Sequence, residues 1–216
     1  MNGRTKVHRP EPETHTGPDE SLLEGFLAGD HEAFEALVQR YSRDLFVFVS
    51  RFLRNPAAAE DVVQDTFVQV YQSAGGFDLS RRFRPWLYTI AANKARDQLR
   101  ERVRKREVSI SGVAGGDYSE EVSYLDFLSD DETRPGDAIE AEEERDIVRT
   151  VVSGMPDHHR EILVLGYYQR LPYKEIAEIL AIPLGTVKSR LHAAVGGFAE
   201  AYKKALKSRG RDDAQG

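Results

Sequence analysis

The sequence predicts an all-α protein of two small helical domains joined by a flexible acidic linker. Apolar residues recur at three- and four-residue spacing along most of the chain, as helices that bury one face require. No stretch alternates convincingly at the two-residue period of a half-buried strand. Charge is also segregated: residues 107–146 carry a net −12, so the rest of a chain whose total is −6 is net basic. An acidic segment between two basic parts indicates a linker between separate domains.

Changes in composition along the chain suggest five segments. Residues 1–20, with several prolines and scattered charge, are expected to be a disordered tail. Residues 21–106 are expected to form the first helical domain and residues 107–134 the linker, which is long for a connection inside a compact domain. Residues 135–207 are expected to form the second helical domain, and residues 208–216 a C-terminal tail.

The bulk composition narrows the class of protein. Of the 216 residues, 40% are hydrophobic and none is cysteine, so disulfides and thiolate metal sites are excluded and a reducing, cytoplasmic location is expected. The N-terminal residues lack the apolar core of a signal peptide. No apolar run approaches the length that spans a bilayer, so we expect no membrane insertion.

In the first domain, capping residues mark where helices begin and end. Asp30 can cap a helix that runs from His31 to about Arg54, and Pro56 can begin the next helix, which ends at Gly75-Gly76. Buried positions at helical spacing in that second helix leave polar side chains on its exposed side. These are Asp61, Gln64, Asp65 and Gln72.

The helix expected from Phe83 to Arg106 carries the most informative pattern. One side is apolar, and the opposite side presents cations, an amide and a carboxylate, with aromatic rings on its flanks. The residues on that polar side and its flanks include Trp86, Tyr88, Asn93, Arg96, Asp97 and Arg100. Cations can contact phosphates and rings can stack on bases, so the pattern suits nucleic acid. The alternative is a solvated basic face with Trp86 in the core.

The second domain contains a predicted helix-turn-helix. Residues 171–192 pair a short apolar-faced helix, a turn at Ala181-Ile182-Pro183 and a polar, cationic second helix. The side chains expected to face the major groove or flanking phosphates are Thr186, Lys188, Ser189, Arg190 and His192. An ordinary helical hairpin is the alternative.

Two strings of residues together resemble one protein family. EDVVQDTF followed by FRPWLYTIAANKARDQLR is similar to region 2 of bacterial RNA polymerase sigma factors of the extracytoplasmic-function (ECF) branch. MPDHHREILVLGYYQRLPYKEIAEILAIPLGTVKSRLH is similar to their region 4. The two strings stand in the family's order, and the matches cover roughly Ser21 to Tyr202.

The resemblance implies a function and a role for each group of residues. Asp61, Gln64 and Asp65 would bind the largest subunits of core RNA polymerase. The helix from Phe83 to Arg106 would recognise and melt the −10 promoter element through the six residues named above, beside a loop at residues 75–82 that receives an extruded base. The helix carrying Thr186 to His192 would read the −35 element. Promoter DNA and an anti-sigma factor are the further partners implied; no cofactor, metal or catalytic residue is.

One stretch departs from the family pattern. After His192 the family usually continues with arginines, whereas this chain has Gly196-Gly197. Each glycine costs a helix about 1 kcal/mol relative to alanine, so we expect the recognition helix to fray or bend after Ala194. The acidic linker would thread toward the polymerase cleft as a nucleic-acid mimic, with an inert tether as its alternative.

Other functions remain as alternatives. A stand-alone helix-turn-helix regulator would explain residues 171–192 but not the first domain. A metal-dependent nucleic-acid enzyme would use Asp61, Asp65 and Asp97 as ligands. A sigma-like adaptor would keep the polymerase face and lose DNA reading.

Overall fold

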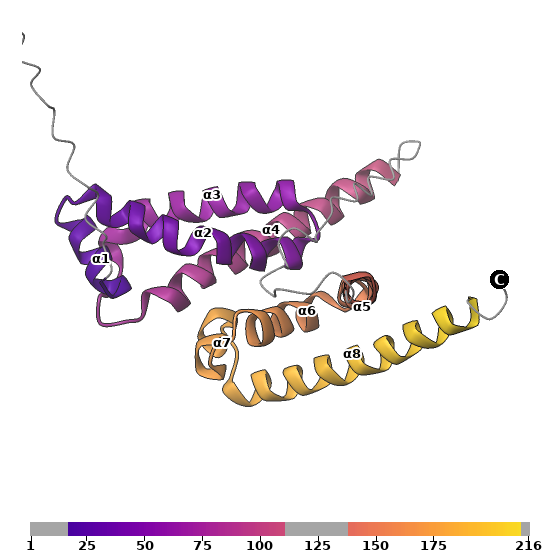
Figure 1. Ribbon diagram of the computed structural model, residues 1–216. Coiled ribbons are helices and arrows are strands. Elements are labelled where there is room, and N and C mark those ends of the chain that lie inside the picture. The colour runs from indigo at the N-terminus through magenta and orange to yellow at the C-terminus, as the bar shows by residue number, and fades with distance from the viewer. Residues whose placement is uncertain (1–16, 111–137, 213–216) are drawn as a thin grey trace, which may run out of the picture.

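The computed structural model describes residues 17–110 and 138–212, and within these ranges every regular element is a helix (Figure 1). The first half contains α1 (Asp19–Leu27), α2 (His31–Leu53), α3 (Pro56–Ser73), the 3₁₀ turn η1 (Ala74–Gly76) and α4 (Phe83–Ile110). The second half contains α5 (Ala138–Gly154), α6 (Asp157–Leu163), the π-helical turn η3 (Val164–Tyr168), α7 (Tyr173–Leu180) and α8 (Leu184–Asp212). The predicted all-α fold is confirmed, whereas residues 111–134 of the expected linker lie outside the described residues.

Side chains cap α2 and α3, which begin at the residues that the sequence predicts. The Asp30 carboxylate accepts hydrogen bonds from the backbone N–H groups of Glu32 and Ala33, at 3.0 and 3.3 Å, and so begins α2. Asn55 accepts from the Ala58 N–H at 2.7 Å and begins α3, whose first residue, Pro56, has no N–H to satisfy. Only Arg54 and Asn55 separate α2 from α3.

The core of the first half lies where α4 packs against α2 and α3. Its large side chains are fully buried: Leu37, Leu45, Phe48, Val70, Phe83 and Leu87. Each such side chain contributes about 1.5–3 kcal/mol relative to an exposed position. The core thus fixes the rotation of α3 and α4, which decides which of their residues face outward.

The second half contains the predicted helix-turn-helix in α7 and α8. Ile176 and Val187 are fully buried and hold the two helices together. Ala181 closes α7 with a left-handed backbone at φ 51°, a conformation that costs a non-glycine residue roughly 1–2 kcal/mol. The sharp turn there separates the two helices without a longer loop.

Helix α8 differs from expectation because it does not break at Gly196-Gly197. It continues to Asp212, with Ala194 fully buried and Phe198 stacked on Tyr202 at a ring-centroid distance of 5.7 Å. Tyr202 also donates a hydrogen bond to Glu144 on α5 at 2.9 Å. Packing against α5 and α6 therefore compensates for the low helix propensity of the two glycines.

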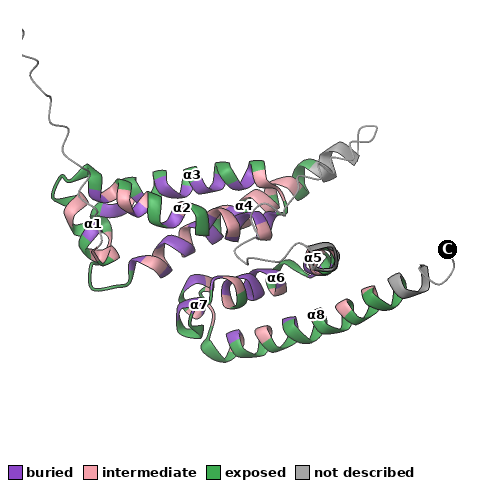
Figure 2. Cartoon of the chain, viewed as in Figure 1, coloured by how far each residue is buried: buried purple, intermediate pink, exposed green. Residues whose placement is uncertain are grey.

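The two halves pack against each other along α4. Figure 1 shows α6 and α7 beneath the bundle of α2, α3 and α4, and Figure 2 shows buried residues on the facing sides of both halves. Arg54 donates to the Ser153 carbonyl at 2.8 Å, and the Arg51 guanidinium lies 3.6 Å from the centroid of the Tyr168 ring. The sequence predicted two domains but not that they would share buried surface.

Helix ends also differ from the expected segment limits. Helix α1 begins at Asp19, inside the expected tail, because the Asp19 carboxylate accepts hydrogen bonds from Arg40 and Tyr41. Helix α4 continues to Ile110 and α8 to Asp212, each beyond the expected domain end. In the described part of the chain no helix combines the length and apolar character needed to cross a membrane.

Candidate polymerase and DNA interfaces

One exposed face of α3 carries the acidic and amide side chains. Asp61, Gln64 and Asp65 are exposed, because Val62 and Thr66 turn the opposite side of the helix into the core. Two large apolar residues that the sequence analysis did not select extend this face: Val68 and Tyr71 are 53% and 51% exposed. Their spacing from Asp61 and Gln64 on a 3.6-residue period could have identified them. The face thus combines carboxylates with apolar surface.

The loop between η1 and α4 is ordered by its own side chains. The Asp78 carboxylate accepts hydrogen bonds from the Ser80 backbone N–H at 3.0 Å and from the Ser80 hydroxyl at 2.7 Å, and these bonds lower the pKa of Asp78. Phe77 packs on Trp86 at a centroid distance of 4.5 Å. Trp86 is therefore half-buried at the base of the loop. Its ring is neither fully solvated nor fully in the core.

The exposed side of α4 presents Asn93, Asp97 and Arg100, as predicted. Arg100 forms a 2.8 Å ion pair with Asp97, one turn away, and both side chains are largely exposed. Arg96 donates to the Asn93 amide oxygen at 2.7 Å. Exposed pairs of this kind are worth little, at most about 1 kcal/mol, so a phosphate or base can compete for either partner.

Tyr88 lies elsewhere than the sequence analysis placed it. It is fully buried rather than on the flank of the exposed face, and burial together with the nearby Asp44 carboxylate raises the pKa of its hydroxyl. The hydroxyl donates to the Gln169 side-chain oxygen of the second half at 2.9 Å. In this conformation its ring cannot stack on a base.

Gln169 is a functional candidate that the sequence analysis missed. Besides accepting from Tyr88, its amide nitrogen donates to the Asp44 carbonyl at 3.1 Å, and its backbone carbonyl accepts from Arg84 at 3.2 Å. It directly follows the π-helical turn η3 and itself has an αR backbone. One buried side chain thus bonds to both α2 and α4, and no local sequence pattern marks it.

Glu161 on α6 forms an ion pair between the halves. Two Arg96 nitrogens, Nε and Nη2, lie 3.1 and 3.0 Å from one Glu161 oxygen. Burial raises the pKa of the Glu161 carboxyl, and Arg96 and Arg190 oppose that rise. A second ion pair, Arg82 with Glu175 at 2.7 Å, joins the loop before α4 to α7.

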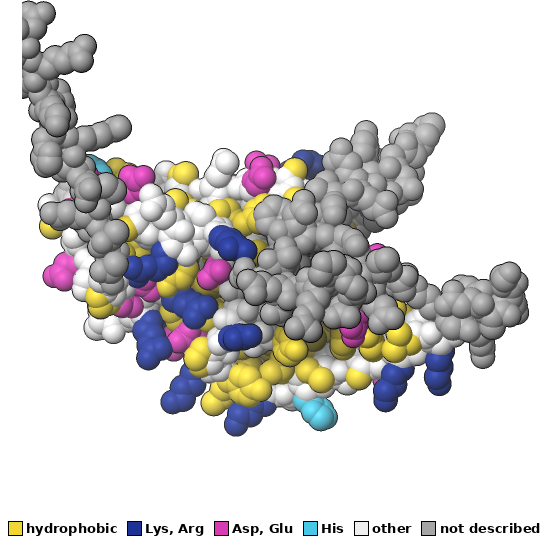
Figure 3. Space-filling view, viewed as in Figure 1, with side chains coloured by type: hydrophobic (Ala, Val, Ile, Leu, Met, Phe, Trp, Pro, Cys, Tyr) yellow, Lys and Arg dark blue, Asp and Glu magenta, His cyan; other side chains and the backbone are white. Residues whose placement is uncertain are grey.

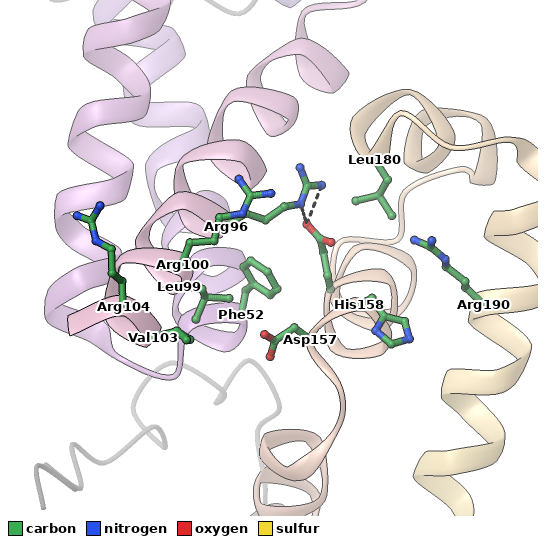
Figure 4. A pocket seen from close by; sticks show the side chains of 11 residues that line it. Phe52, Arg96, Leu99, Arg100, Val103, Arg104, Asp157, His158, Leu180 and Arg190 are labelled. Atoms are coloured by element: carbon green, nitrogen blue, oxygen red, sulfur yellow. Dashed lines mark hydrogen bonds and ion pairs between the residues drawn. The ribbon is translucent and has the colours of Figure 1, made fainter. Parts of the chain in front are cut away.

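The start of α8 presents the predicted −35 residues. Lys188, Ser189 and His192 are exposed, Thr186 is half-buried, and Val187 is buried beneath them. Arg190 differs, because it is half-buried and lines a cleft of about 520 Å³ between the halves. Figure 4 shows Arg190 reaching from α8 toward α6, on the far side of the cleft from Arg96, Arg100 and Arg104 of α4.

The arginines form part of a wider basic surface. Figure 3 shows Lys and Arg side chains on both sides of the junction between the halves and along the outer edge of α8. Among the described residues, no group of three or more His, Asp or Glu side chains could hold a metal ion. Asp97, one of the ligands of the enzyme hypothesis, is paired with Arg100.

Comparison with known proteins decides the family. The family Sigma-70 region 2 matches residues 37–105, and Sigma-70, region 4 matches residues 145–195. The chain is 34% identical to the ECF RNA polymerase sigma factor SigW of Bacillus subtilis over 164 residues, 76% of this chain and 86% of that protein. It is 32% identical to the RNA polymerase sigma-H factor of Pseudomonas aeruginosa over 189 residues, 87% of this chain and 93% of that protein. The chain belongs to the ECF family of RNA polymerase sigma factors.

Solved structures share the fold of this ECF sigma factor. The structure of CnrH in complex with the cytosolic domain of CnrY has a TM-score of 0.62 at 25% identity, covering 86% of this chain and 97% of that chain. The sigma factor RpoE in complex with the anti-sigma factor NepR, from Bartonella quintana, has a TM-score of 0.59 at 22% identity, covering 79% and 96%. The overlays span both halves.

Membership in the family decides between the alternative functions. A sigma factor directs transcription from promoters as part of RNA polymerase, and both of its regions are matched in this chain. The stand-alone regulator would leave the region 2 match unexplained, and the metal-dependent enzyme would leave both matches unexplained, so neither is favoured. ECF sigma factors are not a known class of enzymes.

Proposed function

We propose that this ECF sigma factor binds core RNA polymerase through α3 and contacts the two promoter elements through α4 and α8. The observation that carries the proposal is the separation of three exposed faces: acidic on α3, mixed and arginine-rich on α4, and cationic at the start of α8. A carboxylate-bearing face suits a basic partner and repels DNA, whereas cationic faces attract the phosphate backbone.

The polymerase contact rests on Asp61, Gln64 and Asp65. Their carboxylates and amide can accept charge-assisted hydrogen bonds from a basic helix of the largest subunits. Val68 and Tyr71 add apolar surface one to two turns further along the helix, as the centre of a stable interface requires. The proposed site is therefore an apolar patch with an acidic end.

The −10 contact rests on α4 and the loop before it. Asn93 and Asp97 can bond to exocyclic base groups, and Arg100 can contact phosphate. Trp86 supplies a partly exposed ring beside the loop at residues 75–82, where an extruded base would be held. Tyr88 and Arg96 belong to the same proposed surface, but Tyr88 is fully buried and Arg96 is paired with Glu161, with 27% of its side chain exposed.

The −35 contact rests on the start of α8. Thr186, Lys188, Ser189, Arg190 and His192 lie within two turns, and the first residues of a recognition helix are those that reach base edges in the major groove. Val187 and Ile176 hold this helix on α7. Helix-turn-helix packing thus positions the cations for duplex DNA.

We further propose an anti-sigma factor as a partner and the cytoplasm as the location. CnrH and RpoE were both solved in complex with a partner, which for RpoE is named as an anti-sigma factor. The cytoplasmic location follows from the proposed work on RNA polymerase.

Run-off transcription tests the proposed function. Core RNA polymerase is incubated with a library of random promoters, with and without this protein, and the transcribed templates are sequenced. We expect initiation from a shared two-element motif only when the protein is present. Tight core binding without initiation would favour the adaptor, and failure to bind core would restore the stand-alone regulator.

A further inference from the structure

Helix α4 begins with a cap that the residues next to it do not supply. The position before Phe83 is Arg82, whose side chain has no hydrogen-bond acceptor. Ser80, the nearest residue of a capping type, directs its hydroxyl to Asp78 instead. The acceptor comes from α1, 63 positions away, where Oε1 of Glu20 accepts a hydrogen bond from the Phe83 N–H at 2.9 Å. The start of α4 is therefore fixed by tertiary structure.

Glu20 stands on a segment that is itself held in place. The neighbouring Asp19 carboxylate accepts hydrogen bonds from Arg40 and Tyr41 of α2, the first at 2.5 Å. Arg40 also donates to the Gly17 carbonyl at 3.0 Å. The chain that enters α1 is thus fixed on α2 before Glu20 reaches across to α4, and a cap on a fixed backbone can set the direction of the helix that it caps.

The loop before α4 is an ordered turn with an anchor at each end. Within the turn, the Arg81 N–H donates to the Asp78 carbonyl at 2.9 Å. One anchor is Phe77, whose ring packs on Trp86. The other anchor is the Glu20 cap, and Figure 1 shows α1 at the same end of the bundle as this loop. Because bonds inside the turn keep its shape, the two anchors decide where the turn points.

We propose that Glu20 is a positioning residue for promoter recognition, whose cap on Phe83 directs the loop at residues 75–82 and thereby sets which base this loop accepts. The proposal rests on the proposed contact of the loop and α4 with the −10 element. Asn93 and Asp97 lie further along the same helix, so the bases that they contact keep their geometry when the cap is lost. Loss of Glu20 therefore changes the base preference at the position of the extruded base alone.

Four variants separate the hydrogen bond from charge and from general stability. Glu20→Ala removes the acceptor, whereas Glu20→Gln keeps the side-chain length and a carbonyl oxygen, so the cap should return. Glu20→Asp keeps the charge but is one methylene shorter, so its oxygens should not reach the Phe83 N–H. Glu24→Ala removes a carboxylate at an exposed position one turn further along α1 and is the control. Thermal unfolding followed by circular dichroism gives a temperature at which every variant is folded.

The free protein reports the order of the loop through its own fluorescence. Trp86 is the chain's single tryptophan, and its half-buried ring packs against Phe77 of the loop. We expect the acrylamide quenching constant to rise roughly twofold in Glu20→Ala and Glu20→Asp, as local opening exposes the ring. Glu20→Gln and Glu24→Ala should match the wild type. Wild-type quenching in Glu20→Ala, or recovery by aspartate in place of glutamine, would overturn the positioning role of this hydrogen bond.

Base preference is measured with the holoenzyme on a library of promoters randomised in the −10 element. We expect Glu20→Ala to lower the preference at one position by roughly fivefold, the equilibrium effect of losing one helix cap, and Glu20→Gln to restore it. Leu79→Ala, a change at the exposed turn of the loop, identifies that position independently. A variant that was merely destabilised would lose activity equally on all templates. Altered quenching with unchanged base preference would refute the link to specificity.

The failure of this inference and the failure of the proposed function give different results. A wild-type chain that initiates from no shared motif would contradict the proposed function, and this inference would fall with it. A wild-type chain that initiates from a two-element motif, beside a Glu20→Ala variant that keeps every base preference, would overturn the positioning role alone.

Discussion

At the scale of single residues, Gln169 shows what one buried amide can do. Its oxygen accepts from Tyr88 and its nitrogen donates to the Asp44 carbonyl, so it joins two helices of the first half. Glutamate would lack the donor and leucine would lack both groups. The role of Gln169 therefore depends on both ends of its amide group, and its position after a π-helical turn does not indicate that role.

The α3 cap gives a prediction about stability. Asn55→Ala should lower the free energy of unfolding by about 1 kcal/mol, because the Ala58 N–H loses its acceptor at the start of the helix. Thermal or urea unfolding measures the loss, and Glu60→Ala, an exposed change on the same helix, is the control. Equal stability of the two variants would show that the cap contributes nothing.

The acidic face of α3 gives a prediction about binding. Asp61→Lys combined with Asp65→Lys should abolish binding to core RNA polymerase and leave the circular dichroism spectrum unchanged, because both side chains are exposed. Glu35→Lys, a charge reversal on the exposed side of α2, should bind normally. Holoenzyme formation by the double variant would remove α3 from the proposed interface.

At the scale of elements, α8 combines a recognition segment with a long packing segment. Its first turns present cations to DNA, and its later turns rest on α5 through Tyr202. The two functions use different lengths of one helix. A substitution in the first turns can therefore change DNA contact without changing stability, and a substitution in the later turns can change stability without changing DNA contact.

The recognition segment gives a prediction about salt dependence. Arg190→Ala should weaken binding to −35 duplex DNA and lower the slope of log K against log salt by about 1, the effect of losing one phosphate contact. Lys207→Ala lies on the same helix more than four turns further along and serves as the control. An unchanged slope for Arg190→Ala would mean that this side chain does not touch DNA.

The packing segment gives a prediction about glycine. Gly196→Ala should stabilise the protein by about 1 kcal/mol, because alanine favours the helix and a Cβ at this position meets no heavy atom within 4 Å. Gly29→Ala should do the opposite, since Gly29 has φ +102°. The melting temperatures of both variants test the two expectations. A lower melting temperature for Gly196→Ala would mean that the added methyl group clashes with its surroundings.

At the scale of the whole molecule, the two halves form a joint core along α4. The closed arrangement buries Tyr88 and Glu161, and each buried group has a partner in the other half. The cost of burying the Glu161 carboxylate opposes this packing.

Glu161 makes closure depend on pH. Its pKa is raised by burial above the ordinary 4.5, against the lowering effect of Arg96 and Arg190 and with a small rise from Asp157. Because the closed form binds the proton more tightly than the open form, closure is strongest below 4.5 and weakens as pH rises through the raised pKa. Energy transfer between a dye on α3 at Ala57→Cys and a dye on α8 at Ala199→Cys, both exposed positions, should therefore fall with rising pH in this window.

Several groups around Glu161 could interfere with this titration. Arg96 and Arg100 on α4, Arg190 on α8, and Asp157 and His158 on α6 line the same cleft. Glu161→Gln removes only the carboxyl, so the pH response that it abolishes belongs to Glu161. A response that survives in this variant would assign the effect to one of the neighbours.

The sequence by itself determined the helices, their caps, the helix-turn-helix and the family. Each of these depends on residues close together in the chain: Asp30 with Ala33, Pro56 at the start of α3, or the apolar spacing around Ala181. The exposed acidic face of α3 followed from the same periodicity. Such patterns are readable because a helix repeats locally.

Only the tertiary structure decided how far Tyr88, Arg96 and Gln169 are buried and which residues they contact. Tyr88 and Gln169 are 81 positions apart, and Arg96 and Glu161 are 65 apart. Their meeting depends on which faces of two separately formed domains fit together, and helical periodicity within either domain carries no information about that fit. The continuity of α8 through its two glycines has the same cause, because tertiary packing outweighs local propensity.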